Sequence, residues 1–199
     1  MLDIDLKKHA AEFLRYIRNF QYEVAEDGAV MFPRAAVTAR GGYFHDVNGA
    51  DARYDPNLLP DEGLIYLLNA GLRGGTRPAS WYLSLFSANY TPAANLTAAS
   101  YPATASEIVS ASEGYTEATR PEWTPTDPTS PVLDNLASKA AFTIATTSNL
   151  VVHGAALLSE ATKGAVTGTL ISATKFSSPR TLYDTDVFNL AYRVQLTSN

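Results

Sequence analysis

The last part of the chain carries the pattern that most restricts its fold. In the stretch VFNLAYRVQLT, residues 187–197, apolar side chains at the even-numbered positions alternate, from Phe188 onward, with polar or small ones at the odd-numbered positions. Successive side chains of a β-strand point to opposite faces, so a period of two predicts a strand with one buried face. The other face contacts water or a neighbour. Four further runs are equally rich in strand-forming residues, namely 81–86, 140–145, 150–158 and 170–176.

The segments between these runs are rich in proline, glycine, threonine and aspartate, and no long helix separates the strands. This arrangement favours an antiparallel β-sandwich, jelly-roll-like, over an alternating α/β fold. The fold class is therefore predicted to be mainly β. The two longest connections, residues 87–112 and 120–136, are expected to project from one end of the sandwich.

One short helix is predicted ahead of the strands, in NLLPDEGLIYLLNAGLRGG, residues 57–75. Asn57 can cap it, Pro60 fits the first turn, and the acidic residues that follow suit the positive end of the helix dipole. The glycine pair at 74–75 supplies a stop. We expect a helix from Pro60 to about Leu72, packed at one end of the sandwich.

The N-terminal region carries a second helical pattern. Its apolar residues recur at alternating steps of four and three, which is the stripe of an amphipathic helix from about Asp5 to Ala25. This stripe packs on the protein's own body or docks on another subunit, since such a segment can lie in a partner's groove. The stripe consists of Leu6, Ala10, Phe13, Ile17, Phe20 and Val24.

Residues 28–59 contain several turn-forming pairs, including Gly41–Gly42 and Asn48–Gly49, and show little periodicity. They predict a long irregular connection with one short strand at 29–37. The chain is accordingly divided into an N-terminal helical or extended arm with this connection, residues 1–56, and a β-sandwich domain with a leading helix, residues 57–199.

Composition excludes several classes of function. The net charge of −5 and pI of about 5.1 oppose direct nucleic-acid binding, which needs clustered lysine and arginine. No cysteine is present, so disulfides, thiolate metal sites and cysteine nucleophiles are excluded. The sequence shows no leader pattern, so export is not expected. It also has no apolar run near 20 residues, so a membrane span is not expected.

Candidate catalytic and metal-binding groups are few. The stretch FHDVNGADARYD, residues 44–55, holds oxygen and nitrogen donors, but their spacing does not match a calcium loop and suits turns instead. His153 is expected to be a structural histidine in an apolar strand. Four glutamates fall in stretches that are expected to be solvated, namely Glu107, Glu113, Glu117 and Glu122. No cofactor or metal is expected.

Aromatic residues concentrate between positions 81 and 123. They suit either a stacking surface for sugars or bases, or the packing of a β-core and of subunit contacts. The acidic balance favours packing, because base stacking usually accompanies backbone-tracking charge. The group comprises Trp81, Tyr82, Phe86, Tyr90, Tyr101, Tyr115 and Trp123.

An ordered set of segments resembles a family of tailed-bacteriophage virion proteins, which are small β-sandwich proteins described as cement, head-decoration or tail-fibre-like. The segments are LLPDEGLIYLLNAGLRGG, SWYLSLFSANYTP, EIVSASEGYTEATRPEWTP, AAFTIATTSNLVVHGAALLS and GTLISATKFSSPRTLYDTDVFNLAYRVQLT. The resemblance covers roughly residues 57–199. Its most specific part is a Gly-Tyr, Arg-Pro, Trp pattern formed by Gly114, Tyr115, Arg120, Pro121 and Trp123.

The resemblance implies a virion structural protein, not an enzyme, most simply a decoration or cement protein that bridges neighbouring subunits of the shell. Its partners would be the major capsid protein and copies of itself in a homo-oligomer, and it would be located in the virion after assembly in the host cytoplasm. A tail- or fibre-associated protein that binds a tail partner or a host glycan is the alternative. The residues predicted to contact partners are Leu6, Phe13, Ile17, Phe20, Phe32 and Tyr43.

Overall fold

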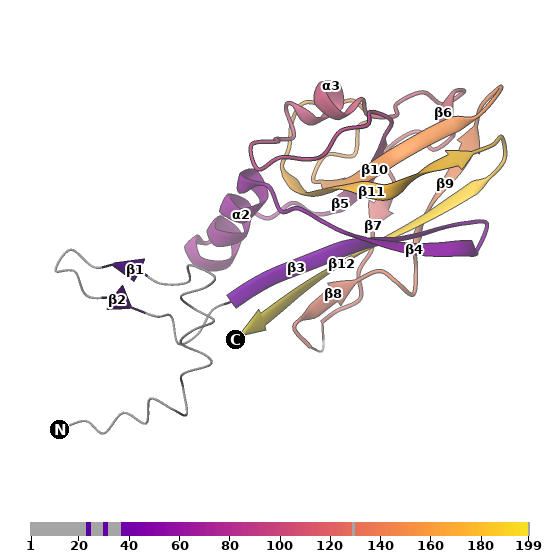
Figure 1. The fold of residues 1–199 in the computed structure, drawn as a ribbon. Helices are drawn as coiled ribbons and strands as arrows, with labels where there is room; N and C mark the ends of the chain where they lie inside the picture. Colours follow the sequence, from indigo (N-terminus) through magenta and orange to yellow (C-terminus); the bar gives the residue numbers. More distant parts are fainter. Residues whose placement is uncertain (1–22, 25–29, 32–36, 129, 199) are drawn as a thin grey trace, which may run out of the picture. The chain divides into compact units, whose positions relative to one another are not determined.

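The computed structural model describes residues 23–24, 30–31, 37–128 and 130–198 (Figure 1). The chain divides into two units, one formed by Met1–Thr38 with Leu196–Asn199 and one formed by Ala39–Gln195. In the first unit, β1 (Glu23–Val24) and β2 (Val30–Met31) pair antiparallel. The helix predicted for residues 5–25 is therefore wrong at its last turn, where strand pairing supplies the backbone hydrogen-bond partners, and the rest of it lies outside the described residues.

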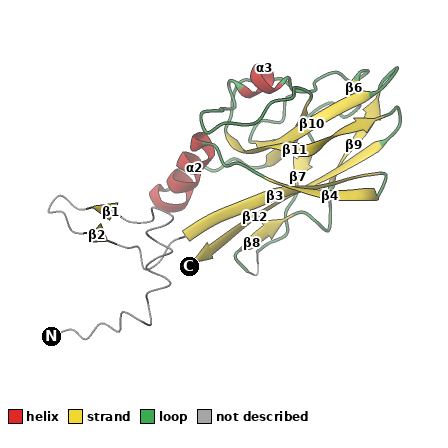
Figure 2. Cartoon of the chain, in the orientation of Figure 1, coloured by secondary structure: helices red, strands yellow, loops and turns green. Residues whose placement is uncertain are grey.

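The second unit consists mainly of two antiparallel sheets packed together (Figure 2). The larger sheet has six strands, in the order β4, β3, β12, β9, β6, with β8 paired to β12. Their bounds are β3 Val37–Val47, β4 Ala50–Pro56, β6 Gly114–Tyr115, β8 Val132–Asp134, β9 Ala140–Ala145 and β12 Val187–Ser198. The predicted mainly β, antiparallel class is confirmed, and the strands at 140–145 and 187–197 lie where the periodicity placed them.

The smaller sheet has four strands, in the order β11, β10, β5, β7. Their bounds are β5 Trp81–Phe86, β7 Glu122–Trp123, β10 Leu150–Leu158 and β11 Leu170–Leu182. β11 is longer than the predicted run at 170–176. It lies beside β4 of the larger sheet, where Thr174 donates its hydroxyl to the Pro56 carbonyl at 2.6 Å and the Ser177 N–H reaches Asp55 Oδ1 at 2.6 Å.

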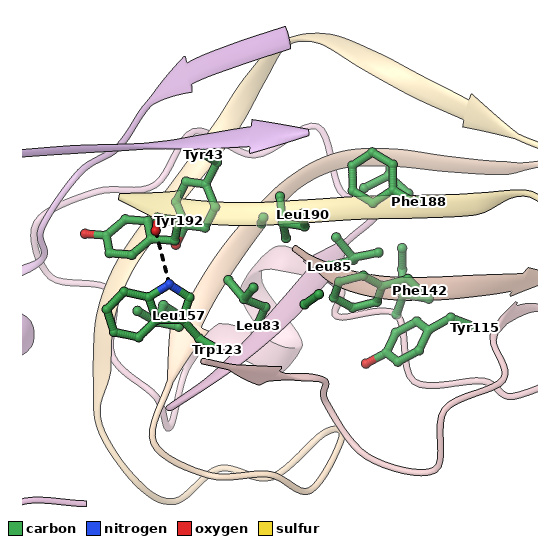
Figure 3. Close-up of a cluster of buried hydrophobic side chains, with 14 of the residues drawn as sticks. Tyr43, Leu83, Leu85, Tyr115, Trp123, Phe142, Leu157, Phe188, Leu190 and Tyr192 are labelled. Carbon is green, nitrogen blue, oxygen red and sulfur yellow. Dashed lines mark hydrogen bonds between the residues drawn. The ribbon is translucent and has the colours of Figure 1, made fainter. Parts of the chain in front are cut away.

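The main hydrophobic core lies between the two sheets (Figure 3). Leu83 and Leu85 of β5 meet Phe188 and Leu190 of β12, and all four side chains are fully buried. Removing this much apolar surface from water is the main favourable contribution to folding. One polar contact ties the sheets together at the core's edge, because the Trp123 indole N–H donates to the Tyr192 carbonyl at 3.1 Å.

A second hydrophobic cluster covers the outer face of the four-stranded sheet. Residues 87–112, predicted to project as a loop, instead fold back over β5, β10 and β11 and include the short helix α3 (Tyr101–Ala105). Leu96, Tyr101 and Ala105 are buried there against Phe86. The prediction of a projecting loop is wrong because Tyr82 and Phe86 place large apolar surface on the outer face of β5 as well, so this face also requires a cover.

The irregular connection predicted for residues 28–59 is also wrong, since β3 and β4 form a hairpin within the larger sheet. Its turn is Asn48–Gly49, with positive φ angles of 54° and 78°. Both central residues of a type I′ turn need positive φ, and Asn-Gly is the pair that adopts it most readily. The two strands lack an alternation of apolar and polar residues because the hairpin buries polar side chains, among them His45 and Asp55.

The predicted helix is confirmed. It comprises α2 (Asp61–Leu68) and a continuous π-helical turn, η1 (Asn69–Arg73), and it ends at Gly74 with a left-handed φ of 75°. The expected cap by Asn57 is wrong, because no side chain caps α2 and the Asn57 amide instead donates to Ser172 Oγ at 2.6 Å.

Candidate interaction surface

Two groups of buried ionisable side chains stand out in the body, and both have structural partners. In the first, Arg120 forms a two-point ion pair with Glu107, with Nε–Oε1 and Nη2–Oε2 distances of 2.7 Å. Both side chains are at most 1% exposed. The expectation that Glu107 is solvated is therefore wrong. Burial by itself lowers the pKa of Arg120, but the hydrogen bonds and charge of Glu107 outweigh it and raise that pKa above its ordinary value.

The other hydrogen bonds of this ion pair hold loops onto the smaller sheet. Glu107 also accepts from Ser84 Oγ at 2.8 Å and from the Gly164 N–H at 3.0 Å, and Arg120 donates to the Glu160 carbonyl at 2.8 Å. A buried ion pair is tolerated when its other polar atoms are satisfied in this way. The pair therefore fixes loop positions, and its carboxylate is already engaged.

The other three glutamates predicted to be solvated have local roles. Glu117 accepts from the Thr143 N–H at 3.0 Å, and Glu113 accepts from the hydroxyls of Thr146 and Thr147. These bonds lower the pKa of Glu113, with the Thr147 hydroxyl as the largest cause. Glu113 and Glu122 are exposed, as expected, and Glu117 is half-buried. No two of these four glutamates form the paired, unengaged carboxylates that acid–base catalysis would require.

The second buried group centres on His45, which is fully buried in β3. Its Nδ1 accepts from Arg180 Nε at 3.0 Å, and its Nε2 lies 2.9 Å from Asp55 Oδ2. Because arginine can only donate, Nδ1 carries no proton and Nε2–H donates to Asp55. Burial lowers the pKa of His45 and outweighs the Asp55 hydrogen bond, so this imidazole is neutral at pH 7. Its ring stacks on Phe176 with 4.1 Å between centroids.

Arg180 completes this group by donating to the Asp51 carboxylate and backbone and to the His45 carbonyl. The cluster thus attaches the β3–β4 hairpin to β11. Asp46 accepts from Lys139 Nζ at 2.6 Å, and Asn48 donates to Asp186 at 2.8 Å. The donors at 44–55 consequently serve turn and strand contacts, and no group of three or more metal-ligating residues occurs within the described parts of the chain.

The aromatic residues support the packing interpretation. Phe86, Tyr101, Tyr115 and Trp123 are buried, whereas Trp81, Tyr82 and Tyr90 are half-buried. Within the Gly-Tyr, Arg-Pro, Trp pattern, Gly114 and Tyr115 form β6, Arg120 is the buried arginine and Trp123 lies in β7. The residues of this pattern therefore have structural positions, in two short strands and a buried ion pair. His153 lies half-buried in β10, at an irregularity in the β10–β11 register.

The predicted partner-contact residues divide into two sets. Tyr43 does not offer a contact surface, because its side chain is fully buried, packs on Tyr192 and donates to the Ser172 carbonyl at 3.2 Å. Its place in the inward row of β3 explains the error. The others lie outside the described residues, namely Leu6, Phe13, Ile17, Phe20 and Phe32.

The feature of the body that does suit a partner is the outer side of α2 and η1, hereafter the apolar helix face. It exposes five large aliphatic side chains, Leu64 (42%), Ile65 (58%), Leu67 (39%), Leu68 (60%) and Leu72 (85%). Contiguous apolar patches of this kind on a small domain usually mark an interaction site.

The opposite side of the helix is held firmly against the body. A Cβ on Gly63 would lie 2.5 Å from the Ile171 carbonyl oxygen, so only glycine permits this approach to β11. Glu62 Oε2 accepts from the N–H groups of Ala98 and Leu170, both at 2.8 Å. The Asp61 N–H is satisfied by the Ala94 carbonyl at 2.9 Å. The apolar helix face is thus presented on a fixed support.

A shallow hollow of about 590 Å³ runs beside the same helix and is lined in part by Ile65, Tyr66, Arg73 and Thr169. The only carboxylate in its lining is Glu62, which is engaged as described. The hollow therefore offers apolar and cationic contacts beside the helix, without a nucleophile and base in reach of each other.

The signal for this surface was present in the sequence. Apart from Asn69, the run LIYLLNAGL is apolar around the helix, whereas a helix packed on one face carries a polar outer side. A helix of that kind at the edge of a folded body favours a second packing partner.

Comparison with known proteins adds no further assignment. No protein-family model matches the chain, and no curated protein is significantly similar to it. Among the helices in the described parts of the chain, none has the length and apolar character to cross a membrane.

Proposed function

We propose that this chain is a bacteriophage virion structural protein, most specifically a capsid decoration or cement protein that stabilises the shell by bridging neighbouring subunits. The observation that carries the proposal is the apolar helix face, held on a β-sandwich whose buried ionisable groups are engaged in structural contacts. The resemblance of residues 57–199 to phage virion proteins supplies the assembly in which such a face would be covered. We further propose that the sandwich is jelly-roll-like.

The physical logic of such a protein is multivalent attachment. Each subunit contributes small contacts, and the symmetric lattice holds many of them at high effective concentration. A rigid β-body suits this task, because little conformational freedom is lost when it binds. In this proposal the protein is not an enzyme and needs no cofactor, and its partners are the major capsid protein and copies of itself in the virion.

The N-terminal region is proposed to act as the arm that reaches the shell. The apolar stripe through Phe13, Ile17 and Phe20 would lie in a groove of the major capsid protein, and burial of such side chains contributes about 1.5–3 kcal/mol each. Replacing one of them by aspartate removes that contribution and places a charge in the contact.

The test uses shells purified from a particle that lacks this protein. Full-length chain should bind them with a fixed stoichiometry and raise their resistance to heat, and Phe13→Asp should weaken binding at least about tenfold. Val166→Asp, at an exposed aliphatic position of a loop, is the matched control and should bind normally. Binding of labelled protein to tails or to host glycan, with bare shells left uncoated, would refute the decoration role.

A further inference from the structure

We infer that the apolar helix face is a self-association surface, on which the α2–η1 helix of a second copy of this chain packs antiparallel about a two-fold axis. This inference rests on the proposed function, in which copies of the chain meet on a shell, and it identifies the surface through which they meet. The occupant follows from three properties of the face, namely its spacing, its charges and its size.

The spacing suits helix-on-helix packing. Ile65, Leu68 and Leu72 follow one another at intervals of three and four, on the side of the helix away from the Gly63 contact with β11. This is the interval at which a narrow apolar stripe meets a partner helix by interdigitating side chains. Leu64 and Leu67 flank the stripe, so the face presents a ridge of aliphatic side chains that another ridge can fill.

The charges select an antiparallel second copy. Asp61 is exposed at the start of the helix and Arg73 is exposed at its end. Within the described parts of the chain, neither side chain has an ion-pair partner. If Leu68 lies at the two-fold axis, Leu64 faces the partner's Leu72, and Asp61 lies two residues, about 3 Å along the helix, from the level of the partner's Arg73. The pair of opposite charges then occurs twice by symmetry, and the two helix dipoles run in opposite directions.

The size of the face sets the strength of the pair. Five partly exposed side chains amount to a patch on the order of a few hundred Å², below the ~800 Å² per partner of a standard stable interface. The pair should therefore be weak in free solution, with a dissociation constant on the order of 10–100 μM. A lattice that holds two copies side by side would raise its occupancy without any new contact.

Sedimentation equilibrium of the full chain, without shells, measures this association directly. The wild type should form a dimer, and Leu68→Asp should weaken dimerisation about 100-fold or more, because both copies then bury an aspartate. Val166→Asp is the matched control, since Val166 and Leu68 are 59% and 60% exposed, and it should dimerise normally. A wild-type chain that remains monomeric at roughly 1 mM would overturn the inference.

Charge exchange tests the orientation. Asp61→Arg alone and Arg73→Asp alone should each weaken the dimer about tenfold, and the double variant should recover most of that loss. Because the chain has no cysteine, Leu68→Cys introduces a unique thiol beside its symmetry mate, and oxidation should link two copies. Oxidation no faster than that of Val166→Cys, or no recovery in the double variant, would refute the two-fold arrangement.

Two further outcomes separate this inference from its alternatives. If Phe13→Asp in the full chain abolishes dimerisation, the face accepts the N-terminal segment of another copy, and the helix-on-helix inference is wrong. If the wild type dimerises as described but does not bind shells, the inference stands and the proposed function fails. Conversely, shell binding that is unaffected by Leu68→Asp, from a chain that is monomeric in solution, would leave the proposed function and remove the inference.

Discussion

Replacing Glu107 by glutamine should be among the most destabilising single-atom changes available in this protein. Glutamine preserves the shape of the side chain, but its single oxygen can accept from only one of Ser84 and Gly164, which donate to different oxygens of Glu107, and it removes the charge opposite Arg120. The guanidinium then remains buried without a counter-charge. Breaking one partner of a buried ion pair costs about 3–5 kcal/mol. For a chain of this size, such a loss corresponds to a decrease in Tm of roughly 6–20 °C.

The measurement is thermal and urea unfolding of Glu107→Gln, followed by circular dichroism, with Glu122→Gln as control. Glu122 is an exposed glutamate in β7, so its replacement should leave Tm nearly unchanged. The double variant Glu107→Gln/Arg120→Met removes the stranded charge and should be more stable than Glu107→Gln alone. A loss below about 1 kcal/mol in Glu107→Gln would refute the argument that the pair is desolvated.

Three further outcomes test the turn, the helix support and the histidine. Gly49 has a φ of 78°, so Gly49→Ala should cost about 1 kcal/mol in urea unfolding. Gly63→Ala, which pushes a Cβ into the Ile171 carbonyl, should cost about 1–3 kcal/mol, whereas Gly71→Ala, with open space around it, should be neutral or slightly stabilising. The pKa of His45 is lowered mainly by burial, so below about pH 6.5 the unfolded chain binds more protons than the native one and Tm should decrease as pH decreases. His45→Gln should flatten that decrease where it begins, just below about pH 6.5, and an unchanged slope there would contradict it.

The strands that the sequence predicted well are those whose buried face is wholly apolar. Phe188 and Leu190 of β12 and Phe142 and Ile144 of β9 alternate with more exposed residues, so period two is visible directly. The β3–β4 hairpin lacked this signal. Its buried positions include His45, whose Nδ1 accepts from Arg180 at a separation of 135 residues. A pairing across that distance becomes visible only when the two strands are placed side by side.

The same limit explains the errors around the smaller sheet. The cover formed by residues 87–112 buries Leu96 and Tyr101 between short polar residues, so neither helical nor strand periodicity marks it. Glu107 and Arg120 lie in segments that read as solvated loops, because a sequence does not show which charged side chains are opposed in the interior. The helix was predictable from Pro60 and the glycine pair. Its exposed apolar side was not, because the sequence does not show which side chains of the helix the body leaves uncovered.

The two buried polar groups and the apolar helix face are physically connected. Buried ion pairs add little net stability, but they disfavour alternative arrangements of the loops that they hold. Here Glu107 and Arg120 fix the loops around the smaller sheet, and Glu62 joins the helix to two backbone N–H groups of that region. A surface of aliphatic side chains on a mobile helix would bind less tightly, because ordering it costs free energy at each encounter. In the proposed self-association, a fixed support would leave more of the free energy of a small interface for binding, because no helix would have to be ordered at each contact.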